Sequence, residues 1–211
     1  MNKDRKLSIK TLAQIAALTA IATAALAARA DGPPLLSNGD FEQYGGSFDS
    51  DGRAFLQPTD SLAGWTVGGL GVALVNTPGL VLSGISMDLL GRDGSGSISQ
   101  TFMAQAGTTY QLDWAQGGGN LGAQLTVGFA DQTSSYYIIQ GARSQQSLQW
   151  TATSSGLQTV SFARASGKDD VIVDGIQLSA VSAVPEPEPY ALLLAGLGAV
   201  GFVARRRGGV R

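Results

Sequence analysis

The chain has 211 residues, a formal net charge of −2, and neither cysteine nor histidine. The absence of these two residue types excludes disulfide-stabilised folds and Ser-His-Asp or Cys-His catalysis, and it argues against zinc chemistry. The length suits one domain with a hydrophobic core, once both chain ends are set apart as targeting segments.

The N-terminus predicts a secretory signal peptide at residues 1–30. Four of the first ten residues are basic, residues 12–28 are apolar or small, and Ala28-Arg29-Ala30 offers a small-x-small cleavage site. This order of basic, apolar and small residues is typical of signal peptides. We expect signal peptidase and the secretion machinery to process the chain after Ala30. The alternative is a retained N-terminal anchor.

Residues 31–182 predict one β-domain. Short alternating runs recur about every ten residues with turn signals between them, and no segment between residues 35 and 180 keeps a helical period for three turns. The expected fold class is all-β, a two-sheet antiparallel sandwich of jelly-roll type. The expected strands are Leu35–Ser37, Gly64–Val67, Val72–Asn76, Ser86–Leu89, Gly96–Phe102, Thr109–Ala115, Ala123–Phe129, Ser135–Gln140, Ser147–Ala152, Leu157–Arg164 and Val171–Leu178.

The net charge of the predicted exported domain limits the kinds of partner that it can bind. Residues 31–184 carry 13 acidic and 5 basic side chains, a net charge of −8, so most basic residues belong to the two targeting ends. An acidic exported domain argues against nucleic acid as a partner. It is compatible with neutral glycans, with cations, or simply with solubility.

Ordered landmarks run through the domain. They are Leu35–Glu42, Gly64–Val67, Ser86–Gly91, Gly96–Phe102, Ala106–Leu112 and Val173–Leu178. In this order they resemble the galactose-binding-like jelly rolls of several carbohydrate-binding modules. They resemble more closely the bacterial choice-of-anchor exported domains, which are related to a plant cell-wall family of undefined function.

This resemblance implies that Glu42 and Asp174 lie close together and help to bind a structural calcium ion. Hard oxygen ligands, completed by backbone carbonyls, suit calcium. The alternative is that the two carboxylates cap turns or pair with arginine.

Sugar binding needs aromatic platforms together with amides or carboxylates. We expect Trp65, Trp114 and Trp150 to pack in the core. Tyr136 and Tyr137 point to opposite sides of a strand, so one ring is expected to be exposed. The polar loop from Gln116 to Asn120 could bring those two amides to a ligand, or it could be a connector only.

The sequence does not predict an enzyme. Carboxylate-pair catalysis stays formally open, with Asp88 and Asp93 or Asp169 and Asp170 as neighbours in the sequence. Acidic residues in turns, however, are usually solvated.

Residues 183–211 form a tail with three parts in a fixed order. The motif Pro185-Glu186-Pro187 comes first, residues 190–204 are apolar, and Arg205, Arg206 and Arg207 begin the basic end at 205–211. As a helix, the apolar run would be roughly 22 Å long against a bilayer core of about 30 Å, a shortfall that snorkelling arginines tolerate. The alternative is a buried C-terminal helix, which would carry a polar face that this run lacks.

The tail resembles the PEP-CTERM sorting signal of Gram-negative bacteria. The resemblance implies that an exosortase, an integral-membrane protease, cleaves the tail after a transient hold in the inner membrane. It further implies a cell-surface or matrix location and an association with exopolysaccharide or biofilm. Whether the exported sandwich binds carbohydrate or is a purely structural or adhesive matrix protein stays open.

Overall fold

The computed structural model describes residues 35–118, 122–139, 141–166, 169–181 and 197. The chain divides into two units, residues 1–180 and 181–211, and each is considered by itself. The expected signal peptide, Asn120, Pro185–Pro187, the expected helix at about 190–204 (apart from Leu197) and Arg205–Arg207 lie outside the described residues. No helix within the described residues has the length and apolarity needed to cross a membrane.

Strands account for most of the described chain. They are β1 (Arg53–Leu56), β2 (Thr66–Gly69), β3 (Val72–Val75), β4 (Ser86–Asp88), β5 (Leu90–Gly91), β6 (Gly94–Ala104), β7 (Thr109–Gly117), β8 (Gln124–Phe129), β9 (Gln132–Tyr137), β10 (Ser144–Thr151), β11 (Gly156–Ser166) and β12 (Ile172–Val181).

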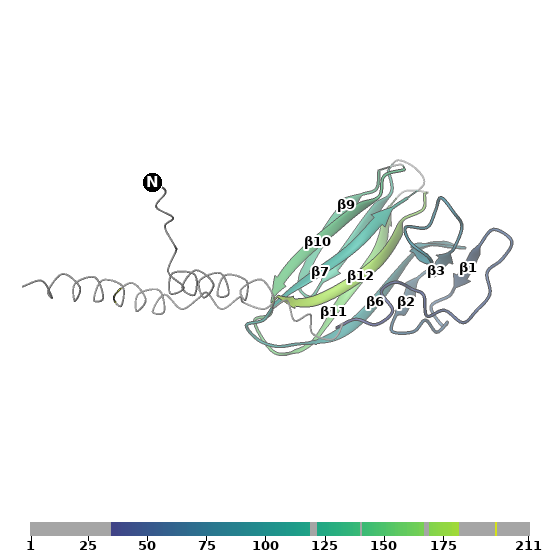
Figure 1. Ribbon diagram of the computed structural model, residues 1–211. Helices are drawn as coiled ribbons and strands as arrows, with labels where there is room; N and C mark the ends of the chain where they lie inside the picture. The colour runs from purple at the N-terminus through teal and green to yellow at the C-terminus, as the bar shows by residue number, and fades with distance from the viewer. Residues whose placement is uncertain (1–34, 119–121, 140, 167–168, 182–196, 198–211) are drawn as a thin grey trace, which may run out of the picture. The chain divides into compact units, whose positions relative to one another are not determined.

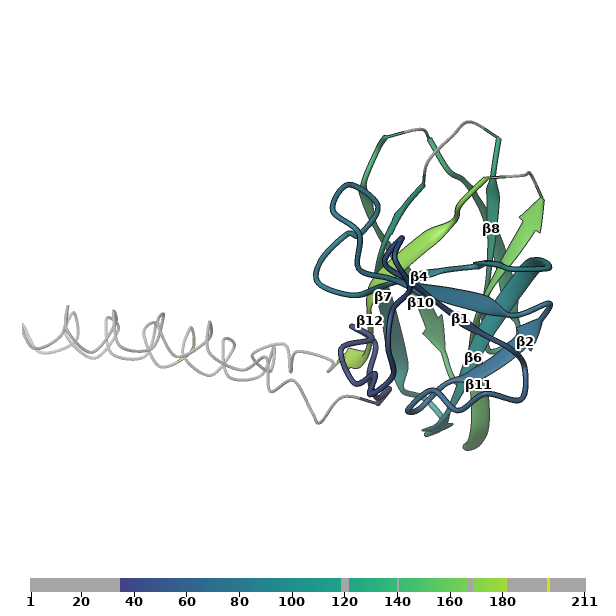
Figure 2. The ribbon, with the colours of Figure 1, turned by 90° about the vertical axis from the view of Figure 1, so that its right-hand side faces the viewer.

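The strands form two sheets. The first has the order β1-β3-β4-β12-β7-β10, and the second has the order β2-β6-β11-β8-β9, with β5 paired to β6. Every strand pairing for which a register is given is antiparallel. Figure 1 shows β12, β7 and β10 side by side, and Figure 2 shows β2, β6 and β11 in the other layer. The predicted all-β, two-sheet antiparallel sandwich of jelly-roll type is confirmed.

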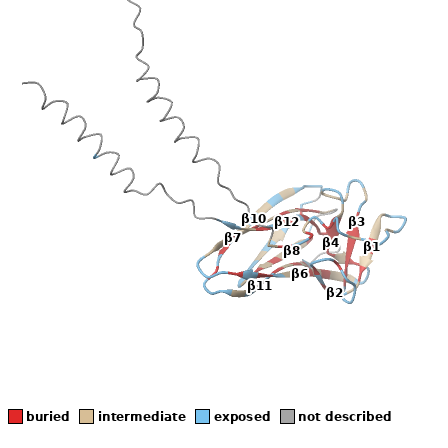
Figure 3. Ribbon diagram, turned by 60° about the horizontal axis from the view of Figure 1, so that its bottom comes forward, coloured by how far each residue is buried: buried red, intermediate tan, exposed pale blue. Residues whose placement is uncertain are grey.

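The core forms where the inward faces of the sheets meet, as Figure 3 shows by burial. In β8, Leu125, Val127 and Phe129 are buried while the residues between them are only partly covered, so the two-residue period of a strand places one face inside. Trp114 has no exposed surface, and it packs edge-on against Phe162 at 5.6 Å between ring centroids. Burying a large side chain of this kind stabilises the fold by roughly 1.5–3 kcal/mol.

The landmarks at the two ends of the domain meet in space. The backbone N–H of Ile176 donates to the carbonyl of Gly39 at 2.9 Å, and the indole N–H of Trp65 donates to the carbonyl of Asn38 at 2.9 Å. A Cβ on Gly39 would collide with the carbonyl of Ile176, so only glycine allows this approach. Hydrogen bonds therefore join three segments that are far apart in the sequence, namely Asn38-Gly39, Gly64-Trp65 and Gly175-Ile176.

The predicted strands are mostly placed correctly, with three differences. Leu35–Ser37 is not a strand; it bends, and the side chain of Gln100 takes up the backbone of Ser37 instead. Strands β1 and β5 are additional, and both are short and lie beside charged or glycine-rich turns. Strands β9 and β10 each begin three residues earlier than predicted, at Gln132 rather than Ser135 and at Ser144 rather than Ser147.

Candidate functional site

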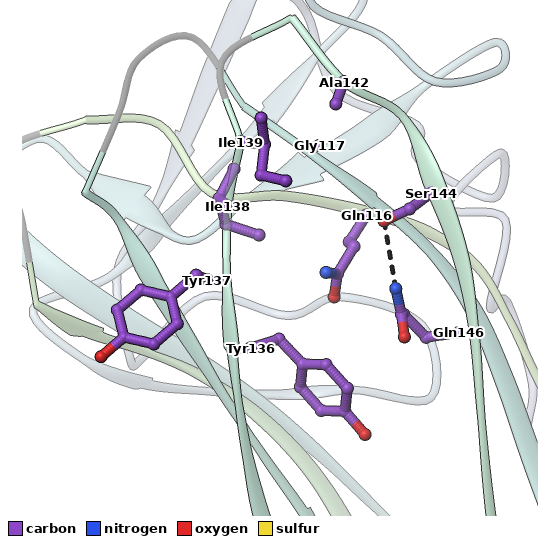
Figure 4. Close-up of a pocket in the computed structure, with 9 residues that line it drawn as sticks. All are labelled: Gln116, Gly117, Tyr136, Tyr137, Ile138, Ile139, Ala142, Ser144 and Gln146. Atoms are coloured by element: carbon purple, nitrogen blue, oxygen red, sulfur yellow. Dashed lines mark hydrogen bonds between the residues drawn. The ribbon is translucent and has the colours of Figure 1, made fainter.

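A cleft of about 220 Å³ opens between the edge strands β9 and β10 (Figure 4). Strand β9 is the last strand of the second sheet and β10 the last of the first, so the cleft lies at an open side of the sandwich. Its lining consists of uncharged side chains and glycine: Gln116, Gly117, Tyr136, Tyr137, Ile138, Ile139, Ala142, Ser144 and Gln146.

Three polar side chains on the inner face of the first sheet line one wall. Ser144 pairs with Gln116 across β10 and β7, and Gln146 follows two residues later, so all three project to the same side. The amide of Gln146 donates to the hydroxyl of Ser144 at 3.1 Å, as the dashed line in Figure 4 marks. The carbonyl of Gln116 accepts from the indole N–H of Trp114 at 3.1 Å. These contacts hold the amides in defined orientations before any ligand arrives.

Tyr136 and Tyr137 of β9 line the opposite wall, but Figure 4 shows that only the ring of Tyr136 points toward Gln116 and Gln146, while the ring of Tyr137 points to the other side of the strand. Tyr136 rests edge-on against Trp114 at 5.1 Å, and its burial raises the pKa of its hydroxyl, a rise that a hydrogen bond with Ser134 partly offsets. Tyr137 is 75 % exposed. The prediction that one of the two rings would be exposed is confirmed.

The structure therefore brings together Gln116, Tyr136 and Tyr137 from the predicted ligand-binding set. The sequence analysis missed Ser144 and Gln146. A signal for them existed, because Trp150 faces inward and residues at every second position before it must face the same way. The predicted strand began only at Ser147 and so left both residues out.

The expected core positions of the tryptophans are confirmed. Trp65, Trp114 and Trp150 are all buried. Trp150 stacks on Tyr110 with ring centroids 6.0 Å apart, and Trp65 contacts Phe41 at 5.8 Å. None of the three offers a platform for a ligand.

Glu42 and Asp174 both accept hydrogen bonds from the segment 83–86. The side-chain oxygen of Glu42 accepts from the backbone N–H of Ile85 at 2.7 Å. Asp174 accepts from the N–H of Ser83 at 3.0 Å and from the hydroxyl of Ser86 at 2.9 Å. Burial raises the pKa of Asp174 to about 6, these hydrogen bonds oppose the rise, and the charge of Glu42 adds to it.

Two features decide whether this pair suits a cation. The two carboxylates repel each other, and a bound cation would relieve this repulsion. A carboxylate has about four lone-pair positions, and the hydrogen bond from Ile85 uses one of those of Glu42. The backbone N–H groups of Ser83 and Ile85, however, cannot act as ligands, and the hydroxyl of Ser86 already accepts from the N–H of Leu82 at 2.9 Å. No group of three or more acidic residues is gathered for a metal among the described residues. A calcium ion here would need carbonyl or water oxygens beside the two carboxylates.

The neighbouring carboxylates of the sequence are not the ones that meet in the fold. Asp88 meets Asp170 rather than Asp93, because Arg53 contacts both, at 2.7 Å to Asp88 and 3.3 Å to Asp170. Burial, followed by the charge of Asp170, raises the pKa of Asp88 above its usual range. Burial lowers the pKa of Arg53, but the hydrogen bond and charge of Asp88, helped by Asp170, more than offset this and raise it.

A shallow groove of about 470 Å³ lies beside this ion-pair network. It is lined by Asp49, Asp51, Arg53, Phe55, Leu90, Gly91, Arg92 and Asp170. The guanidinium of Arg92 stands 4.7 Å from the ring centre of Phe55. The groove is thus rich in charge where the cleft between β9 and β10 has none.

Comparison with known proteins identifies the tail. Residues 183–207 match the family model of the PEP-CTERM protein-sorting motif. The chain therefore carries the sorting signal of exported proteins that its tail resembled. A search of the curated proteins found no match to this sequence.

The solved structures similar to this chain include carbohydrate-binding modules. One is TmCBM61 in complex with β-1,4-galactotriose, with 12 % identity, 71 % of this chain and 100 % of that chain covered, and a TM-score of 0.43. Another is the CBM22-1 xylan-binding domain of Paenibacillus barcinonensis Xyn10C, with 15 % identity, coverage of 64 % and 99 %, and a TM-score of 0.45. A third is a family 16 carbohydrate-binding module, with 15 % identity, coverage of 51 % and 84 %, and a TM-score of 0.40.

Proposed function

We propose that this protein is a non-catalytic, exported matrix or cell-surface protein that binds a neutral saccharide in the cleft between β9 and β10. The observation that carries the proposal is the lining of that cleft, where oriented amides and a hydroxyl face the ring of Tyr136 with no charged side chain between them. Amides match the hydroxyls of a sugar, and a tyrosine ring matches its apolar face. The volume is below the roughly 300–1,000 Å³ of drug-sized sites, so it suits a single sugar ring.

Charge favours a neutral ligand over an acidic one. The body has a net charge of −8, which repels anionic polysaccharides at low ionic strength. Two of its basic side chains, Arg53 and Arg164, are already engaged, by carboxylates and by Ser95 respectively. A neutral hexose or pentose unit within an exopolysaccharide is the ligand class that remains.

Catalysis is not part of this proposal. A glycosidase of the common type needs two carboxyl groups that both reach the scissile bond. The side chain of Asp88 has no exposed surface, and both Asp88 and Asp170 are held by Arg53. This arrangement supports a structural role for the pair.

The binding test uses two adjacent glutamines of one strand. Gln146 lines the cleft, whereas Gln145 is exposed on the outer face of β10. On a glycan array and in calorimetry with the organism's own exopolysaccharide, we expect Gln146→Ala to weaken binding about 3- to 10-fold, the loss of one hydrogen bond. Gln145→Ala should bind as the unchanged protein does. If the unchanged protein binds no polysaccharide saturably, the protein is a purely structural or adhesive one.

The second part of the proposal is processing of the tail. An exosortase would recognise the motif at Pro185–Pro187, cleave the chain and release the sandwich from the inner membrane to the surface or matrix. The match of residues 183–207 to the sorting motif supports this. Replacing Pro185, Glu186 and Pro187 together with alanine should leave full-mass protein in the membrane fraction. A normal mature mass and normal surface display would contradict it.

The third part is a structural calcium ion held by Glu42 and Asp174. The closeness of the two carboxylates and the raised pKa of Asp174 support it. Calcium should raise the melting temperature of the protein, EDTA should reverse the rise, and Asp174→Asn should abolish it. An identical melting temperature with calcium and with EDTA would exclude the site.

A further inference from the structure

Strand β9 is a free edge of the second sheet. It pairs with β8 on one side, and no strand of the described residues pairs with its other side. The N–H of Ile138 donates to the carbonyl of Ala123 at 2.9 Å, which continues the β8–β9 ladder by one residue pair. Because an antiparallel ladder alternates, the even-numbered residues of β9 bond to β8. The N–H and C=O groups of Thr133, Ser135 and Tyr137 therefore point away from the sheet.

This edge lacks the features that usually block strand addition. Proteins protect edges with charged residues, proline or very short strands. The edge strands β1 and β2 have four residues each; β1 begins with Arg53, and β2 ends in two glycines. The run Gln132–Ile139 has no charge, no proline and no glycine, in a body with a net charge of −8. Such runs of high β-propensity readily pair with one another.

We propose that β9 pairs antiparallel with β9 of a second copy of this chain, about a two-fold axis at Ser135. The edge is self-complementary, as a two-fold interface requires. In this register Thr133 lies opposite Tyr137 of the second copy, Ser135 lies opposite its own equivalent, and all three outward-facing residues form hydrogen-bonded pairs. The two second sheets then become one continuous sheet.

Exposure and charge both favour a second copy as the partner. Tyr137 and Ile139 are 75 % and 62 % exposed, and a neighbouring strand would cover part of each. The acidic residue nearest to β9 in the sequence, Asp131, lies opposite Ile139 of the second copy. The two Asp131 side chains are then about 27 Å apart at 3.4 Å per residue, well beyond the Debye length of about 8 Å. Two acidic bodies can thus meet at this edge without bringing like charges together.

The pairing does not depend on saccharide binding, and its test uses no glycan. The chain contains no cysteine, so a single introduced cysteine reports on one position. The full chain is produced in its own cells with the sorting machinery present, as Ser135→Cys or as Thr133→Cys. In the proposed register the two copies of residue 135 have Cα atoms about 5.5 Å apart, a separation that a disulfide spans, whereas the two copies of residue 133 are about 14 Å apart.

After oxidation we expect a dimer band on a non-reducing gel for Ser135→Cys and almost none for Thr133→Cys. No dimer band from Ser135→Cys, or equal bands from both variants, would overturn the proposal. Light scattering gives a second measure. Ser135→Lys should abolish the dimer, whereas Thr126→Lys should keep it, because Thr126 lies opposite Ser135 on β8 but not at the edge. A monomeric unchanged protein at all concentrations would also overturn it.

Discussion

The two sides of the sandwich differ in the length of their edge strands and in their charge. On the side of β1 and β2, edge strands are short and charged groups are drawn inward, with Arg53 joining Asp88 to Asp170. On the side of β9 and β10, edge strands have six and eight residues and carry no charge, and a cleft opens between them. On the side of β1 and β2, the charged side chains form ion pairs that hold strands together. On the side of β9 and β10, backbone and amide groups remain available to other molecules. An acidic protein can in this way present one side on which charge does not repel its partners.

The largest effect is expected from removing the cation of the charged side. Arg53→Met leaves Asp88 buried without its partner, which typically costs about 3–5 kcal/mol of unfolding free energy. Arg92→Met is the matched control, because Arg92 is exposed and contacts only the ring of Phe55 among the described interactions; it should cost less than about 1 kcal/mol. Urea denaturation measures both. Equal losses of unfolding free energy in the two variants would mean that the ion pairs of Arg53 do not stabilise the side of β1 and β2.

A pH titration sharpens the comparison further. Burial raises the folded-state pKa of Asp174 to about 6, above the value of 3.8 for an unperturbed aspartate. The folded protein therefore binds the proton more tightly than the unfolded chain does, and stability falls as the pH rises from about 4 to 6, by up to about 3 kcal/mol. The raised pKa of Asp88 acts in the same direction. In calcium-free buffer, Asp174→Asn should flatten the fall, and a curve that rises over this range would contradict the assignment.

The smallest effects are expected within the uncharged side. Tyr136→Ala removes the ring that rests on Trp114 and should cost about 1–2 kcal/mol. Tyr137→Ala removes an exposed ring and should change stability by less than about 0.5 kcal/mol. Thermal unfolding compares the two. If Tyr137→Ala proved as costly as Tyr136→Ala, Tyr137 would not be the exposed ring of the pair.

Much of the fold follows from local pattern, and much of the site does not. Alternation predicts the long strands because residues such as Leu125, Val127 and Phe129 carry the signal within one strand. It fails at Leu35–Ser37, where the side chain of Gln100, 63 residues away, replaces a strand partner. Strand β5 was not predicted either, because it has only two residues and runs into the turn-forming sequence Gly91-Arg92-Asp93-Gly94.

The site depends on contacts that no local pattern contains. The cleft joins Gln116 on β7 to Gln146 on β10 and Tyr136 on β9, and only the sheet order brings these strands to one side. The pairing of Asp88 with Asp170 spans 82 positions through Arg53, so acidic residues adjacent in the sequence were poor guides to it. The tail is the reverse case, since its sorting motif at residues 183–207 is contiguous and can be identified from the sequence alone.

The position of Trp114 has an optical consequence. Its indole N–H donates to Gln116 and its ring meets Tyr136, so the fluorophore touches two residues that line the cleft. Trp65 donates instead to the backbone of Asn38 and contacts the same Phe162 as Trp114, whereas Trp150 stacks on Tyr110. A ligand that shifts Gln116 or Tyr136 alters the electric field at one indole of three, against a constant background from the other two. The unlabelled protein thus carries its own fluorescent reporter of cleft occupancy.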